Sequence, residues 1–440
     1  MPRIIFDLQE VYYPQYMYKT AYKNMLLLMF QESIFAFLSL VDVTYTGALG
    51  NDCLLGVTYA TTVLNLITNL HNVFTVSLRV IQARYIGAND EEGVKSALTA
   101  CSLISSSIAA VVSIICLFFS RQILGLSALS PGQLEAASQY LVYRLPGYFL
   151  TSIYKGVFRT AEARGLMSKL VKVRLINLVN IPLNLIFMHV LGVKGIALST
   201  DITEILEFML VLFIFKPKWG KPHKEQIIEV CRYGLTGLPQ RFVSPLTRLF
   251  VQNAYLSWLS PAHSALMCLV DKFYYNIYCI ISGATKYVEP LLGQPYGSGD
   301  RAALGAAYYT YKHCFSCILL LHIPITLGAG LIYLGCVLPS DAGLAVLLLA
   351  TRIAVAMPYF MGLSLENVLR VYGVLKPVAV ARVLGLTVFK LLALYGGLYL
   401  GMDVFVLSFY SLMGDLPCVF TTVYLIQKRE YLSFPDKHLA

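Results

Sequence analysis

Asp42 lies inside a strongly apolar segment, where an ionised carboxylate is unfavourable unless it is paired, hydrated or protonated. At the helical rise of about 1.5 Å per residue, it sits roughly 10 Å below the predicted outer end of its segment. Asn180 and Asn184 are four residues apart in a later apolar segment, so they share one face of a helix at a similar depth. Thr200 and Asp201 reach that depth in the segment that follows.

Carboxylate and amide oxygens are suitable ligands for Na⁺ or a proton. The sequence therefore predicts a cation-coupling site at this depth. Its members are Asp42, Asn180, Asn184, Thr200 and Asp201. The alternative is a packed polar cluster that joins helices without a coupling role.

Two further acids, Glu204 and Glu207, follow Asp201 at intervals of three residues, so they neighbour one another along a helix. Such a series is suited to pass a proton inward. It is equally consistent with acids that face water and transfer nothing, because acids in membrane spans mark pathways as well as hydrated cavities. Both interpretations are open at this point.

The second half of the chain places charges at the middle depth of its apolar segments. We expect a substrate cavity formed by Arg248, Asp271, Lys272, Arg352 and the aromatic face of Tyr275. One interpretation is an ion pair between Arg248 and Asp271, with the other cations bonded to carbonyls or reaching the interface. The other is a cavity that accepts negative charge on the cargo.

These residues must be positioned by membrane-spanning helices. The 440 residues are 57% hydrophobic and only 13% charged, which excludes a soluble globular protein. Twelve apolar segments recur, each long enough to cross about 30 Å of hydrocarbon. Their predicted limits are 24–49, 54–82, 96–120, 134–156, 170–191, 194–215, 229–259, 263–292, 306–336, 342–369, 375–400 and 403–427.

The net charge of +10 comes from Lys and Arg between the segments, so it indicates orientation and not a nucleic-acid partner. If the N-terminus is inside, only Arg121 and Lys194 lie in outer connections. The inner connections hold Arg84, Lys95, Lys155, Arg159, Arg164, Lys169, Lys172, Lys216, Lys218, Lys221, Lys224, Arg301, Lys312, Arg370 and Lys376. We therefore expect a multi-pass protein of the cytoplasmic membrane with both termini in the cytoplasm.

The chain also repeats itself at a constant offset. The stretch YIGAND at 85–90 matches PYGSGD at 295–300, glycine on glycine and aspartate on aspartate. The fold class predicted from this is an all-α polytopic membrane protein with two six-helix lobes, related by pseudo-two-fold symmetry along the membrane normal. The lobes are predicted at 1–215 and 229–440, joined by a cytoplasmic linker at 216–228, and we expect a monomer.

The sequence gives no indication of a metal site, a cofactor other than the coupling ion, or an enzyme active site. Cys314 and Cys317 have CxxC spacing beside His313, but the other two ligands that tetrahedral zinc needs are missing nearby. His71 and His322 are expected to be hydrogen-bonded core residues. No nucleophile stands at a useful spacing from a base.

Six stretches in order resemble the multidrug and toxic compound extrusion (MATE) family of the larger flippase and exporter superfamily. They are VDVTYTGALG (41–50), ARYIGAND (83–90), LVNIPLN (178–184), GVKGIALST (192–200), GLPQ (237–240) and LRVYG (369–373). The resemblance implies ion-coupled export of small organic molecules by alternating access of two lobes. Within the same superfamily, the alternatives are a flippase for lipid-linked saccharides or an exporter of an anionic metabolite.

Two positions depart from the family pattern. Many relatives carry an aspartate where Asn184 stands, which leaves one carboxylate fewer here, and Asp201 is the expected replacement. Many relatives also place a glutamate about two turns after the Gly-Leu-Pro, whereas this chain has Arg248 beside that position.

Overall fold

A computed structural model describes residues 15–126, 129–337, 342–374, 376–407, 409–410, 416 and 419–424 of the chain, and within these residues all regular structure is helical. The first half contains α1 (Gln15–Ala48), α2 (Asn51–Gly87), α3 (Glu91–Leu124), α4 (Pro131–Tyr143), α5 (Leu145–Ala163), α6 (Met167–Arg174), the 3₁₀ helix η1 (Leu175–Val179), α7 (Asn180–Leu191) and α8 (Val193–Phe215).

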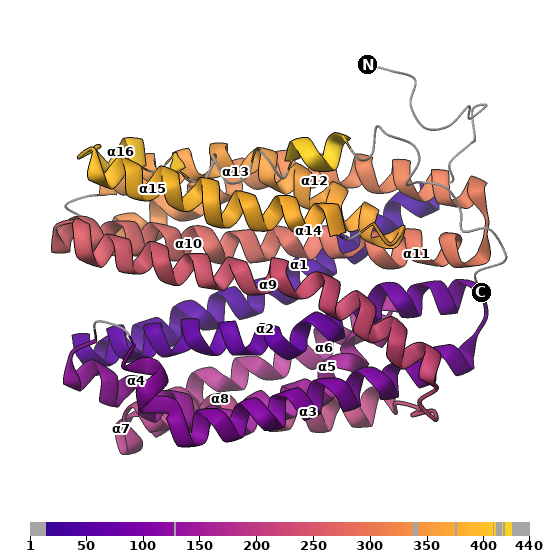
Figure 1. Ribbon diagram of the computed structural model, residues 1–440, viewed down its shortest axis with the longest axis horizontal. Coiled ribbons are helices and arrows are strands. Elements are labelled where there is room, and N and C mark those ends of the chain that lie inside the picture. Colours follow the sequence, from indigo (N-terminus) through magenta and orange to yellow (C-terminus); the bar gives the residue numbers. More distant parts are fainter. Residues whose placement is uncertain are drawn as a thin grey trace. The chain divides into compact units, whose positions relative to one another are not determined.

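The second half contains α9 (Lys224–Trp258), α10 (Pro261–Lys286), α11 (Val288–Ser298), α12 (Arg301–Val337), α13 (Ala342–Val371), α14 (Lys376–Val383), the π-helical turn η2 (Leu384–Phe389), α15 (Lys390–Tyr399) and α16 (Val404–Leu407) (Figure 1). Each of the first eleven predicted spans coincides with one of these helices or with consecutive ones. The twelfth begins at α16, and much of its remainder lies outside the described residues.

Seven described segments are long and apolar enough to cross a membrane by length and composition alone. They are Met17–Ala48, Asp52–Gly87, Glu91–Leu124, Met167–Leu191, Arg301–Cys336, Gly343–Val371 and Lys376–Tyr399. Other predicted spans are not in this set because they carry too many charges or are divided into shorter helices. α8 carries three acids, and the predicted span 134–156 is divided into α4 and α5 at Arg144. α5 also continues to Ala163, so Arg159 lies on a helix and not in the connection where the sequence placed it.

Local breaks in the helices have identifiable causes. Pro182 lies near the start of α7, and a proline both lacks the N–H that would bond to the fourth residue before it and collides with that carbonyl. The turn that precedes it is the 3₁₀ helix η1, which uses tighter hydrogen bonds. The π-helical turn η2 inserts an extra residue between α14 and α15, a feature found frequently at functional sites.

The chain divides into two compact units, and the divisions fall inside helices. The N-terminal unit is Phe30–Pro245; the C-terminal unit is the described part of Met1–Met29 and Leu246–Ala440. The divisions therefore lie within α1 and within α9, where Pro245 marks the second one. The lobes predicted at 1–215 and 229–440, with a linker at 216–228, stay a prediction.

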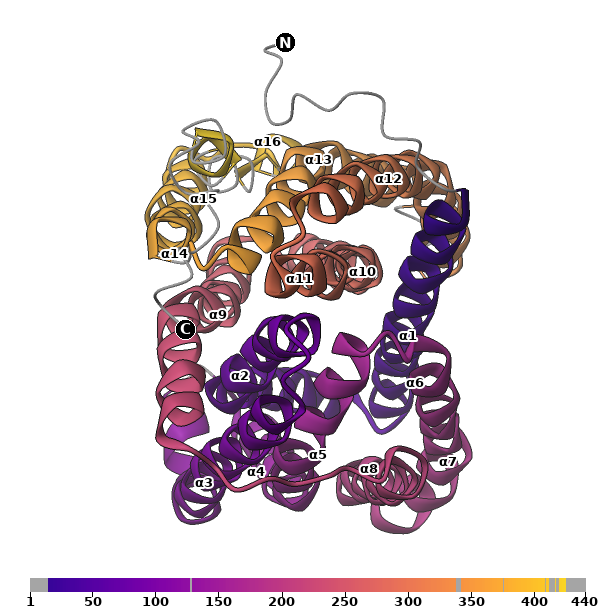
Figure 2. The ribbon, with the colours of Figure 1, turned by 90° about the vertical axis from the view of Figure 1, so that its right-hand side faces the viewer.

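In the N-terminal unit, α2 packs on α3, α4 and α5, and α8 packs on α5 and α7 (Figure 2). The approach of α2 to α4 is close at Gly56, because a Cβ there would collide with the carbonyl oxygen of Gln133. The first half of α9 belongs to this unit and approaches α2 in the same way, at Gly234 against the ring of Phe74. Small residues at such contacts are typical of helices packed in membranes.

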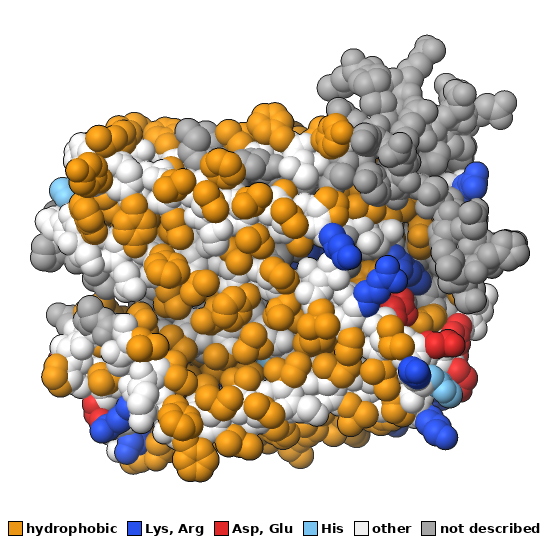
Figure 3. Space-filling model, in the orientation of Figure 1, with side chains coloured by type: hydrophobic (Ala, Val, Ile, Leu, Met, Phe, Trp, Pro, Cys, Tyr) orange, Lys and Arg blue, Asp and Glu red, His pale blue; other side chains and the backbone are white. Residues whose placement is uncertain are grey.

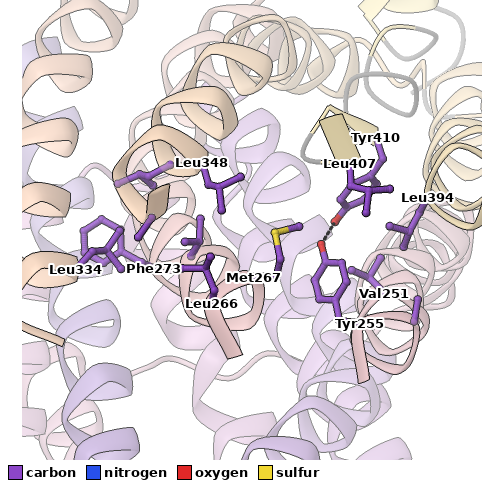
Figure 4. Packing of buried hydrophobic residues seen from close by; sticks show 14 of the residues in the cluster. Val251, Tyr255, Leu266, Met267, Phe273, Leu334, Leu348, Leu394, Leu407 and Tyr410 are labelled. Atoms are coloured by element: carbon purple, nitrogen blue, oxygen red, sulfur yellow. Dashed lines mark hydrogen bonds between the residues drawn. The ribbon is translucent and has the colours of Figure 1, made fainter. Parts of the chain in front are cut away.

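The C-terminal unit is built around α10, which packs on α12 and α13, and around α11, which packs on the same two helices. Its apolar core gathers side chains from α9, α10, α12, α13, α15 and α16 (Figure 4). The core residues Leu334, Leu348 and Leu394 have no exposed surface. Such close packing stabilises the helix contacts through van der Waals attraction.

The repeat seen in the sequence has the same local structure in both units. Asp90 caps α3 by accepting from the backbone N–H of Gly93 at 2.8 Å, and Asp300 caps α12 by accepting from Ala303 at 2.9 Å. Residues with positive φ precede the two caps, Asn89 at 58° and Gly299 at 75°. The matched aspartates are therefore helix N-caps, which explains why they recur at these turns.

A buried ion pair also recurs, with its charges reversed. In the N-terminal unit Arg79 of α2 binds Glu162 of α5 at 2.8 Å, with side chains only 3% and 1% exposed. In the C-terminal unit Glu289 of α11 lies 3.5 Å from Arg370 of α13. The acid and the base have thus exchanged helices, because the pairing itself, and not its direction, satisfies two buried charges.

Glu162→Gln should destabilise the protein strongly, because Glu162 binds both Arg79 at 2.8 Å and Arg159 at 2.7 Å in a buried site. Breaking a buried pair costs about 3–5 kcal/mol, which we expect to lower the melting temperature by roughly 10 °C. The measurement is thermal unfolding in detergent. Glu135→Gln, which breaks an exposed pair with Arg121, is the matched control and should cost less than about 1 kcal/mol. Equal melting temperatures for the two variants would show that the Glu162 pair is not important for stability.

Candidate functional site

Asp42 of α1 is held by a network of amides and hydroxyls from α7 and α8, named here the Asp42 site. The Nδ2 amide of Asn184 donates to Asp42 Oδ1 at 2.6 Å and to Asn180 Oδ1 at 2.7 Å. Asn180 in turn donates to the Thr200 hydroxyl at 3.1 Å, and the Ser199 hydroxyl donates to Asn184 Oδ1. Asp42, Asn180, Asn184 and Thr200 are therefore brought together as the sequence predicted.

The Asp42 site combines buried amides with a carboxylate that remains partly accessible. Asn184 is fully buried and Asn180 is 3% exposed, whereas Asp42 is only half-buried. Both N–H groups of Asn184 and its oxygen are used, so its amide is fixed in orientation. An ionised carboxylate offers about four acceptor positions, and such oxygens are suited to bind a proton or a cation.

Asp201 lies in a different cluster, although the sequence predicted it beside Asp42. Arg144, at the junction of α4 and α5, donates to Asp201 Oδ1 through Nη1 and to Glu204 Oε1 through Nη2 at 2.9 Å. The backbone N–H of Gly147 donates to Asp201 Oδ2 at 2.9 Å. The reason is helix geometry: Asp201 is on the face of α8 that packs on α4 and α5, while Thr200 is on the face toward α7.

Glu207 is bound one turn further along α8 by a second arginine. Arg174 of α6 donates to Glu207 at 2.5 Å, and the hydroxyl of Tyr154 donates to it at 2.8 Å. The guanidinium of Arg174 lies between two aromatic rings, 4.4 Å from the centroid of Phe35 and 4.1 Å from that of Phe158. Arg174 therefore ties α1, α5, α6 and α8 together through one planar, always charged group.

The three acids of α8 are thus bound by two arginines, Asp201 and Glu204 by Arg144 and Glu207 by Arg174. The predicted proton relay through Glu204 and Glu207 stays a prediction. The arrangement favours a structural role for these acids, because Arg144 and Arg174 bind their carboxylates through hydrogen bonds that connect α8 to the neighbouring helices.

In the C-terminal unit, Asp271 of α10 pairs with Arg352 of α13, and not with Arg248 as one interpretation of the sequence had it. Arg352 Nε lies 2.9 Å from Asp271 Oδ1, and the Tyr255 hydroxyl donates to Asp271 Oδ2 at 2.9 Å. Arg352 Nη2 donates to the Tyr255 oxygen at 3.1 Å. Figure 4 shows the hydroxyls of Tyr255 and Tyr410 facing each other at the edge of the apolar core, 3.1 Å apart.

The other charged residues of this region, including Lys390, which the sequence analysis did not name, are placed differently. The guanidinium carbon of Arg248 stacks 3.6 Å above the centroid of the Tyr275 ring, and the Arg248 side chain is half-buried. Lys390, directly after the π-helical turn η2, lies with its amine 5.4 Å from the Tyr410 ring. The side chain of Lys272 lies outside the described residues.

Several residues of these clusters were not identified from the sequence. Arg144, Arg174 and Lys390 are ionisable residues inside predicted spans, and the principle that drew attention to Asp42 applies equally to them. Ser199, Tyr255 and Tyr410 gave no such signal, because hydroxyls are common in apolar segments and only the fold shows their partners. Over the described residues, no group of three or more His, Cys, Asp and Glu side chains is arranged to hold a metal ion.

Comparisons with known proteins show which families and solved structures this chain is similar to. The family model MatE matches residues 28–186, and no curated protein sequence matches the chain. The fold is similar to that of the Vibrio cholerae MATE transporter VcmN, crystallised as a point mutant, with 16% identity and a TM-score of 0.83 over 94% of this chain and 97% of that one.

Two further solved structures are similar over nearly their whole length. One is an outward-facing multidrug resistance MATE family transporter, with 16% identity and a TM-score of 0.82 over 96% of this chain and 97% of that one. The other is a transporter of the MOP superfamily from Pyrococcus furiosus, with 16% identity and a TM-score of 0.83 over 94% and 96%.

The chain therefore contains a MatE domain and has the fold of the MATE transporters, which confirms the resemblance and the fold class predicted from its sequence. It is a multi-pass membrane protein with the fold of these transporters, set in the lipid bilayer.

Asp201→Asn should lower stability, because Asp201 pairs with the buried Arg144 and is bound outside the hydrogen-bonded network of Asp42. Loss of one charge-assisted bond to a buried arginine costs about 2–3 kcal/mol. Thermal unfolding in detergent measures this, with the exposed Asp52→Asn as control. An unchanged melting temperature together with loss of ion-driven transport would instead assign Asp201 to the coupling site.

Proposed function

We propose that this protein is a secondary active antiporter. It couples entry of H⁺ or Na⁺ to the export of small organic molecules across the cytoplasmic membrane, by alternating access of two lobes and with no cofactor besides the coupling ion. The observation that carries the proposal is the Asp42 site, in which the carboxylate of α1 is held 2.6 Å from the buried amide of Asn184.

The chemistry of the Asp42 site suits reversible binding of one cation. The surrounding amides and hydroxyls are neutral, so protonation or Na⁺ binding changes the net charge of the site by one. Because hydrogen bonds connect α1 to α7 and α8 here, a change in the charge of Asp42 alters the contacts between these helices. A carboxylate that is partly accessible exchanges its cation more readily than a buried one.

The pivots for alternating access are proposed to lie within α1 and α9. The first half of α9 is attached to the N-terminal unit, since Tyr85 donates to Glu229 at 2.6 Å and the linker N–H of His223 donates to Ser96 at 2.9 Å. The linker therefore moves with that unit. Movement of one unit relative to the other is then taken up at the divisions within the two helices, where Pro245 weakens the hydrogen-bond ladder of α9.

The proposed orientation places both termini in the cytoplasm, and the proposed assembly is a monomer. Support for the orientation comes from the excess of Lys and Arg in the connections assigned to the inner side. Figure 3 shows charged side chains gathered at the two ends of α3 and apolar side chains covering the surface between them. That distribution is typical of helices that cross hydrocarbon.

Asp42→Asn should abolish gradient-driven efflux, because the amide can neither bind a proton nor supply a negative charge to Na⁺. The measurement is transport by the purified protein in sealed vesicles with an imposed pH or Na⁺ gradient; the gradient that drives the unmodified protein identifies the coupling ion. Asp52→Asn, an exposed acid of α2, is the control and should transport normally. Normal efflux by Asp42→Asn would refute the assignment.

The cargo is proposed to be anionic or zwitterionic. The motive is the guanidinium of Arg248, which is half-buried and stacks on Tyr275 in a stretch where the sequence offers no acid. Positive charge in a poorly hydrated site is stabilised by an anionic ligand. The similar Pyrococcus furiosus transporter is described as having a binding pocket of reversed polarity that suggests a different function, so a change of pocket charge has a parallel on this fold.

A flippase for lipid-linked saccharides is the second candidate. The same arginine favours it, since guanidinium groups bind pyrophosphate through charge-assisted hydrogen bonds. The Asp42 site favours the antiporter, because a flippase has no need of a coupling carboxylate held in a preorganised network.

Arg248→Gln should reduce transport of anionic dyes at least tenfold and leave cationic dyes unaffected. Arg248 is the suitable position because it is half-buried and stacks on Tyr275, whereas Arg352 is buried in an ion pair and its loss would damage the fold. Lys312→Gln, an exposed position on α12, serves as control. Equal transport of both dye classes by Arg248→Gln would contradict the role in cargo binding, and efficient efflux of cations alone by the unmodified protein would reject an anionic cargo.

A further inference from the structure

The N-terminal unit has a cavity of about 290 Å³ at the end of the bundle where α3 begins and where α5 and α8 end. It is distant in sequence from Asp42 and belongs to neither of the proposed coupling and cargo sites. Its walls are the first two turns of α3, the last two turns of α5 and the start of the linker after α8.

The wall formed by the linker is fixed in place. The backbone N–H of Gly220 donates to the Thr99 hydroxyl at 3.1 Å, and that of His223 donates to the Ser96 hydroxyl at 2.9 Å. Gly220 is needed for this approach, because a Cβ would lie 2.8 Å from the Cβ of Lys95 and 3.1 Å from α3 backbone. Figure 2 shows the linker running from α8 past α3 to the start of α9.

The polar part of the cavity lining is strongly basic. It contains Lys95, Arg164, Lys216 and Lys218 against the single acid Glu91. Arg164 pairs with Glu91 at 2.5 Å, and Lys95 pairs with Glu92 at 2.7 Å. Over the described residues, Lys216 and Lys218 form no ion pair, so positive charge is concentrated on the linker wall.

Apart from the hydroxyl of Thr160, the rest of the lining is apolar. It consists of Val94, Leu98, Val157, Ala161, Leu166, Phe215 and Pro217. On α8, before the cavity, Met209 and Phe213 are 61% and 75% exposed, and on α3 Leu103 is 54% exposed. Exposed apolar side chains therefore stand on the two helices whose ends form the basic cavity.

We propose that this cavity binds the phosphate-bearing headgroup of an anionic phospholipid, whose acyl chains lie on the exposed apolar side chains of α3 and α8. Lys216 and Lys218 bind the phosphate, and basic pockets between helices at the cytoplasmic side are suited to such headgroups. A water-soluble phosphate compound would use the same lysines but would leave those apolar side chains without a ligand. A bound lipid joins α3, α5, α8 and the linker, and so stabilises the N-terminal unit.

The test compares lipids on the whole purified protein in a neutral detergent. Dioleoylphosphatidylglycerol should raise the melting temperature by several degrees, and dioleoylphosphatidylcholine at the same concentration should raise it by less than half as much. The double variant Lys216→Ala/Lys218→Ala should lose most of the difference between the two lipids. Native mass spectrometry should show correspondingly less retained phosphatidylglycerol on this variant.

Two controls make the result specific. Lys221→Ala/Lys224→Ala removes two exposed linker-region lysines that do not line the cavity, and it should respond to phosphatidylglycerol like the unmodified protein. Gly220→Ala keeps every charge but displaces the linker wall, and it should lose lipid retention. Equal responses of the two double-lysine variants, or equal protection by both lipids, would overturn the proposal. Equal protection by millimolar glycerol 3-phosphate would reject a lipid in favour of a soluble phosphate ligand.

Discussion

The structure depends on one constraint, which is that a charge placed among apolar helices must find a partner within the same unit. Arg79 with Glu162, Arg144 with Asp201 and Glu204, and Arg174 with Glu207 each connect different helices of the N-terminal unit. Helices in a membrane lack a hydrophobic driving force toward one another, so such bonds and close packing at small residues fix their arrangement. The partners also determine what each acid can do. An acid bound by an arginine joins two helices through an ion pair, whereas Asp42 is in contact with the Asn184 amide and its network.

The sequence was sufficient to predict the helices of the first eleven spans, the internal repeat and the grouping of Asp42 with Asn180, Asn184 and Thr200. Hydropathy and helical periodicity are local properties, and the depth of a residue follows from counting along a span. The partner of Asp201 was not predictable, because neighbouring residues on a helix point about 100° apart and only the packing of α8 shows which helix each one faces. The breaks at Arg144 and at the π-helical turn η2 escaped prediction for a related reason, since tertiary contacts and not composition determine where a long span is interrupted.

The two units illustrate how a repeat diverges. The helix caps Asp90 and Asp300 are alike in residue and geometry, because a turn between packed helices allows few solutions. The buried pairs Arg79–Glu162 and Arg370–Glu289 preserve the interaction but exchange the charges. The Asp42 site has no counterpart of its kind among the described residues of the C-terminal unit, where Arg352 and Asp271 pair instead. Features that hold the fold are thus shared, and the groups suited to ion and cargo binding differ.

The presence of Asn184 where many relatives carry an acid leaves the Asp42 site with one carboxylate, and this has a consequence for the energetics of transport. In the proposed antiport mechanism, one carboxylate carries one monovalent cation inward per cycle. If an anion with one negative charge leaves in exchange, each cycle moves the equivalent of two positive charges into the cell. A membrane potential of 100 mV supplies about 2.3 kcal/mol per charge, hence roughly 4.6 kcal/mol per cycle. That energy sustains a cargo gradient on the order of a thousandfold even when the cation itself is equally concentrated on both sides. The voltage across the membrane would then be the main energy source of this transporter, and the ion gradient a secondary one.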